Sequence, residues 1–70
     1  MDIPPDLTIT MDDILRAGHC ARGTRRWFDE FGLDFRAFLK SGIPATDLAA
    51  TGDGLAIQVI KRTLRDRRHG

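Results

Sequence analysis

The side chains best suited to chemistry in this chain are two histidines and one cysteine. His19 and Cys20 are adjacent, and neighbouring side chains on a helix point about 100° apart, so the pair is a poor chelate for one metal ion. His69 lies far from both in the sequence. No nucleophile–base pair, carboxylate pair or metal-ligand set is indicated. We therefore expect a protein that is not an enzyme and that uses no metal and no cofactor.

The turn Thr51-Gly52-Asp53-Gly54 precedes an expected helix and resembles an anion-binding loop in its glycine content. It lacks the longer glycine spacing and the lysine of a P-loop, and Asp53 would repel a phosphate. We interpret it as a turn whose aspartate caps the following helix.

Charged side chains are grouped, although the net charge is only +1. The first 13 residues contain four aspartates and no Lys or Arg, whereas residues 61–68 are strongly basic. A second basic group, Arg22, Arg25 and Arg26, would supply the phosphate contacts if nucleic acid were bound. Such groups favour contact with phosphate or with an acidic protein face.

The length of 70 residues and a hydrophobic fraction of 41% are typical of one small domain with a single core. No apolar run reaches the roughly 20 residues that a membrane span needs, so no membrane contact is expected. The single cysteine excludes an internal disulfide and favours synthesis in a reducing cytoplasm.

An all-α fold is predicted: a single domain of about five short helices with an extended N-terminal arm. Pro4 and Pro5 favour extended geometry over residues 1–9. The helical domain is expected over 10–66 and a basic tail over 67–70. The helices are predicted at about 11–17, 20–31, 35–41, 44–50 and 54–66, and no strand is expected.

Helix ends are marked by N-cap side chains and by glycines. The predicted N-caps are Thr10, Asp34 and Asp53. The glycines expected to end helices in left-handed geometry are Gly32, Gly42 and Gly52.

Apolar side chains at helical spacing predict the core. The second helix carries a stripe of Cys20, Thr24, Trp27, Phe28 and Phe31, so Cys20 is expected to be buried. The third helix adds Phe35, Phe38 and Leu39. The last helix adds Ala56, Val59, Ile60, Thr63 and Leu64. Ile57 falls toward the outside and indicates a contact surface.

Four sequence elements follow one another within residues 10–60. They are Cys20-x-x-Gly23-x-Arg25-x-Trp27-Phe28, Phe31-Gly32-Leu33-Asp34-Phe35-x-x-Phe38, Gly42-Ile43-Pro44 and Leu48-x-Ala50-Thr51-Gly52-Asp53-x-x-Ala56. Together they resemble a family of small, uncharacterised phage and prophage proteins of tailed phages. That family often has a histidine where Phe31 stands and Ala-Met where Gly54-Leu55 stands. The resemblance implies an origin, and it carries over no catalytic residue.

The leading hypothesis is a non-enzymatic, phage-derived helical protein that acts by protein–protein contact. We expect a virion structural or accessory component (head–tail or tail) or an assembly helper, present in the host cytoplasm or incorporated in the virion. The expected partners are other phage structural proteins or further copies of the chain in a homo-oligomer, and no small-molecule substrate. The candidate partner contacts are Ile3, Leu7, Ile57, Lys61, Arg62, Arg65 and Arg68.

Two alternatives stay open: a small DNA-binding regulator and an inhibitor of a host protein. Residues 35–50 loosely mimic a helix-turn-helix. However, residues 43–54 contain no Lys or Arg and carry Asp47 and Asp53, which phosphates would repel. Nucleic-acid contacts are therefore expected from the arginines of the second helix or from the basic tail.

Overall fold

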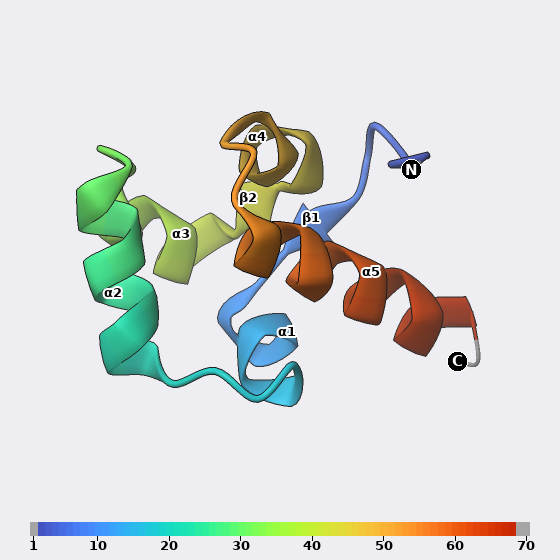
Figure 1. Cartoon of the computed structure of the whole chain (residues 1–70), viewed down its shortest axis with the longest axis horizontal. Coiled ribbons are helices and arrows are strands. Elements are labelled where there is room, and N and C mark those ends of the chain that lie inside the picture. The colour runs from blue at the N-terminus through green and yellow to red at the C-terminus, as the bar shows by residue number, and fades with distance from the viewer. Residues whose placement is uncertain (1, 69–70) are drawn as a thin grey trace.

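The computed structural model describes residues 2–68, and it confirms the all-α prediction for a small single domain (Figure 1). The helices are α1 (Met11–Arg16), α2 (Ala21–Glu30), α3 (Phe35–Ser41), α4 (Ala45–Ala50) and α5 (Gly54–Arg68). Two short strands, β1 (Thr8–Ile9) and β2 (Ile43–Pro44), pair antiparallel. In Figure 1, α2 lies at one end of the molecule, and α5 crosses in front of the strands toward the other end.

The predicted N-caps are confirmed. Thr10 and Asp13 form a capping box at the start of α1, because each side chain bonds the other residue's backbone N–H. Asp34 accepts a hydrogen bond from the backbone N–H of Ala37 at 3.1 Å. Asp53 accepts one from the N–H of Ala56 at 3.0 Å, which confirms its assignment as the cap of α5.

The second half of the predicted extended arm, residues 1–9, is packed into the core. Leu7 and Ile9 are buried in the core, and Thr8 and Ile9 form β1. The backbone carbonyl of Leu7 also accepts a hydrogen bond from the N–H of Ala45 at 2.9 Å. The prolines keep residues 4–5 out of a helix, as expected, but the apolar residues after them complete the core.

Gly42 makes the pairing of β1 and β2 sterically feasible. Its φ is 78° and its ψ is −175°, a backbone region that is essentially restricted to glycine. A β-carbon at this position would lie 2.5 Å from Cγ2 of Thr8 and 2.9 Å from the carbonyl oxygen of Ile9. Gly42 therefore ends α3, as predicted, and also lets β1 approach the chain.

The core lies where the strands, α2, α3 and α5 meet, and its largest fully buried side chains are Phe28, Ile9 and Ile60. The ring of Phe28 contacts those of Phe35 and Phe38, with centroids 5.6 and 4.6 Å away. These edge and tilted contacts between aromatic rings tie α2 to α3.

Three residues predicted to be buried are exposed instead. Cys20 is exposed because it stands one residue before α2, as its N-cap, where the helical stripe does not apply. Phe31 is 40% exposed because α2 ends before it. Leu39 is 54% exposed because it lies beside Phe38 on the outer flank of α3.

The C-terminal basic segment is ordered further than predicted. α5 runs through Arg68, two residues past the predicted end at 66. One nitrogen of Arg67, Nη2, donates to the carbonyl oxygen of Thr8 and to the carboxylate of Asp13, each at 3.3 Å. Arg67 is therefore a tertiary contact of the domain and not part of a free tail.

Candidate functional site

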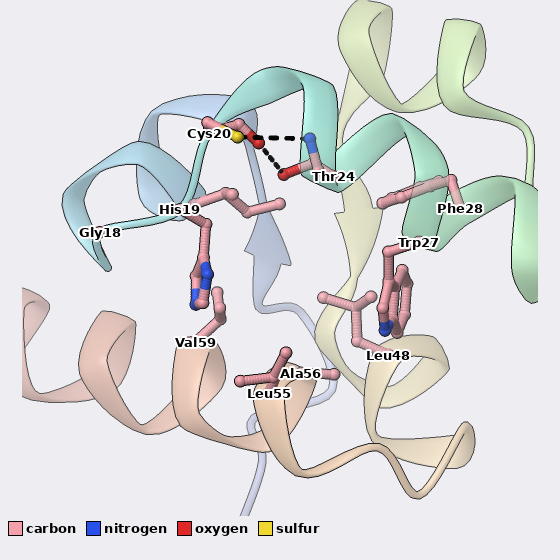
Figure 2. Close-up of a pocket in the computed structure, with 12 residues that line it drawn as sticks. Gly18, His19, Cys20, Thr24, Trp27, Phe28, Leu48, Leu55, Ala56 and Val59 are labelled. Carbon is pink, nitrogen blue, oxygen red and sulfur yellow. Dashed lines mark hydrogen bonds between the residues drawn. The ribbon is translucent and has the colours of Figure 1, made fainter.

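A pocket of about 380 Å³ opens between α2 and the first turns of α5 (Figure 2). We call it the α2–α5 pocket. Its lining comes from the end of α1, the α1–α2 connection, α2, α4 and α5. The lining residues are Ile14, Gly18, His19, Cys20, Gly23, Thr24, Trp27, Phe28, Leu48, Leu55, Ala56 and Val59. Its size lies near the lower end of ligand pockets, which measure roughly 300–1,000 Å³.

The pocket exists because α2 and α5 pack mainly on other elements. α2 packs on α1 and α3, whereas α5 packs on α4 and α1. Gly23 adds to the opening, since it places no side chain on the pocket face of α2. The nearest atom to a β-carbon built there is Sγ of Cys20, at 3.4 Å. Among the described residues, no atom of another backbone segment lies within 4 Å of that position.

The pocket walls are predominantly apolar. Figure 2 shows Trp27 and Phe28 above and Leu55, Ala56 and Val59 below, with Leu48 beside them. Leu55 is 53% exposed, so part of this apolar wall meets solvent. Apolar surface that is concave and open to solvent is typical of a binding site.

Trp27 carries an unpaired polar atom in this wall. Its Nε1 is buried and has no hydrogen-bond partner among the described residues. An unpaired buried donor costs about 1–3 kcal/mol.

The thiol of Cys20 serves the backbone of α2. Its Sγ accepts a hydrogen bond from the N–H of Gly23 at 3.3 Å, and its carbonyl accepts from the hydroxyl of Thr24 at 2.8 Å (Figure 2). The ring of His19 points toward Val59, away from the thiol (Figure 2). Within residues 2–68 no group of three or more His, Cys, Asp or Glu side chains is placed to hold a metal ion.

The predicted partner contacts of the arm and of α5 are only partly accessible. Leu7 is buried, so it is not available to a partner while the arm is seated. Ile3 and Ile57 are half-buried, and Ile3 packs against the core. The side chain of Arg68 lies outside the described residues.

The basic side chains of α5 are accessible. Lys61, Arg62 and Arg65 are exposed, and with Gln58 they line a shallow depression along the helix. Arg62 pairs with Asp66 at 3.4 Å, an exposed i,i+4 ion pair that contributes little to stability. Three of the four basic side chains predicted as contacts on α5 are therefore exposed.

The arginines of α2, Arg22, Arg25 and Arg26, are also exposed. At about 100° per residue they share the side of the helix that is turned away from the lining residues Thr24 and Trp27, and Arg22 lies almost opposite them. None of the three predicted phosphate contacts lines the pocket.

The sequence did not predict the pocket. Trp27, Ala56 and Val59 lie in stripes that were assigned to the core, and periodicity cannot show that two stripes face each other across a gap. The one usable signal was Leu55, which falls at the edge of the α5 stripe and is exposed.

None of the helices over residues 2–68 is long and apolar enough to cross a bilayer. No family model, curated protein or solved structure matches the chain.

Proposed function

We propose that this chain is a non-enzymatic helical module that works by protein–protein contact through the α2–α5 pocket. The observation that carries the proposal is the apolar wall that Leu55 presents to solvent beside Trp27 and Val59. Filling it would bury apolar surface, which stabilises a complex by about 25 cal/mol per Å².

The resemblance to small proteins of tailed phages supports placing this contact in virion assembly. The module would then be a structural or accessory component of the head–tail or tail region, or an assembly helper. Assemblies of that kind are symmetric, so a small interface repeated in many copies reaches a useful affinity.

Site-specific photo-crosslinking in the source cell tests the proposal. A photoreactive amino acid replaces Leu55 at the pocket mouth, and in a matched control it replaces Arg36, an exposed residue of α3. We expect one discrete protein adduct from position 55 and none from position 36. Failure to form an adduct at 55, or equal adducts at both positions, would refute the proposal.

The identity of the crosslinked protein distinguishes a role in virion assembly from the inhibition of a host protein. A capsid, connector or tail protein places the chain in the virion or its assembly. A host enzyme or defence protein favours the alternative of a host-protein inhibitor. Mass spectrometry of purified particles then shows whether the chain stays in the virion at a fixed, symmetric copy number.

A DNA-binding regulator is the second candidate function, because the row of Lys61 and Arg65 on α5 is exposed and basic. It requires duplex affinity that falls steeply as salt rises. It also requires loss of that affinity in the variant Lys61→Ala/Arg65→Ala or in the triple variant Arg22→Ala/Arg25→Ala/Arg26→Ala. Salt-independent or absent duplex binding would eliminate this candidate.

A further inference from the structure

We draw no further inference here: the strongest candidate, the apolar α2–α5 pocket that Trp27 and Leu55 line, belongs to the site already described, and nothing in the structure shows what covers it.

Discussion

Arg67 in the last turn of α5 donates to the buried carboxylate of Asp13 in the first turn of α1, with Nη2 and Oδ2 3.3 Å apart. The same nitrogen reaches the carbonyl of Thr8 in β1. Asp13 also accepts from the backbone N–H and the hydroxyl of Thr10. One carboxylate therefore caps α1 and joins it to the far end of the chain.

Substitution of Asp13 and substitution of Arg67 should lower the free energy of unfolding by unequal amounts. Asp13→Ala should cost about 1–2 kcal/mol, because it removes the capping box and leaves Arg67 without its anion. Arg67→Ala should cost about 1 kcal/mol or less, since the arginine is half exposed and the ion pair is screened. Urea unfolding measures both, with Arg65→Ala as the control. A larger loss in Arg67→Ala than in Asp13→Ala would contradict this account.

Gly42 should tolerate substitution least among the helix-ending glycines. Gly42→Ala combines positive φ with a collision against the backbone of Ile9, so we expect a loss of about 3 kcal/mol or more. Gly52→Ala has positive φ but open space, and it should cost about 1 kcal/mol. Thermal unfolding followed by circular dichroism compares the two. Similar losses would show that β1 does not constrain Gly42.

Truncation tests whether the N-terminal segment is packed into the core. Deletion of residues 1–9 removes the buried Leu7 and Ile9, at about 2–5 kcal/mol each, which exceeds the stability expected of so small a domain. We expect the circular-dichroism helix signal to collapse. Deletion of residues 1–5 leaves both side chains and should keep the signal. A folded protein after the longer deletion would show that Leu7 and Ile9 are not needed for the core.

Substitution of Cys20 distinguishes a cap from a core residue. Cys20→Ser places a stronger acceptor at the N-cap of α2, so stability should stay constant or rise by about 0.5 kcal/mol. A buried cysteine of the core would instead lose stability on this change. The midpoint of denaturant unfolding decides between the two, and a loss above about 1 kcal/mol would contradict the capping role.

The buried hydroxyl of Thr63 offers a stabilising change. Its Oγ1 has no hydrogen-bond partner among the described residues, so Thr63→Val should raise stability by about 1 kcal/mol. Thr24→Val is the matched control, because it removes a real bond to the carbonyl of Cys20 and should destabilise. If both variants changed the free energy of unfolding in the same direction, the hydroxyl of Thr63 would not be an unpaired buried group.

The sequence predicted the features that depend on local chemistry. The caps at Thr10, Asp34 and Asp53 and the positive φ of Gly42 follow from side-chain reach and steric rules that act within a few residues. The buried face of α5 around Val59 followed from helical spacing.

What the sequence did not predict depends on contacts between distant segments. The two-residue strands are too short for an alternating pattern, so the pairing of Ile9 with Ile43 left no periodic signal. The ion pair between Arg67 and Asp13 joins residues 54 positions apart. The α2–α5 pocket follows from how helices sit relative to one another, which periodicity does not encode.

The pairing of β1 with β2 also has a consequence for the order of folding. It encloses α1, α2 and α3 in one loop, so its entropy cost must be met before the pairing contributes any stability. The helices between the strands have 6, 10 and 7 residues and are marginal in isolation, so they depend on this closure for their stability. We expect closure to be the rate-limiting step, so Gly42 substitutions should slow refolding more than they raise the unfolding rate.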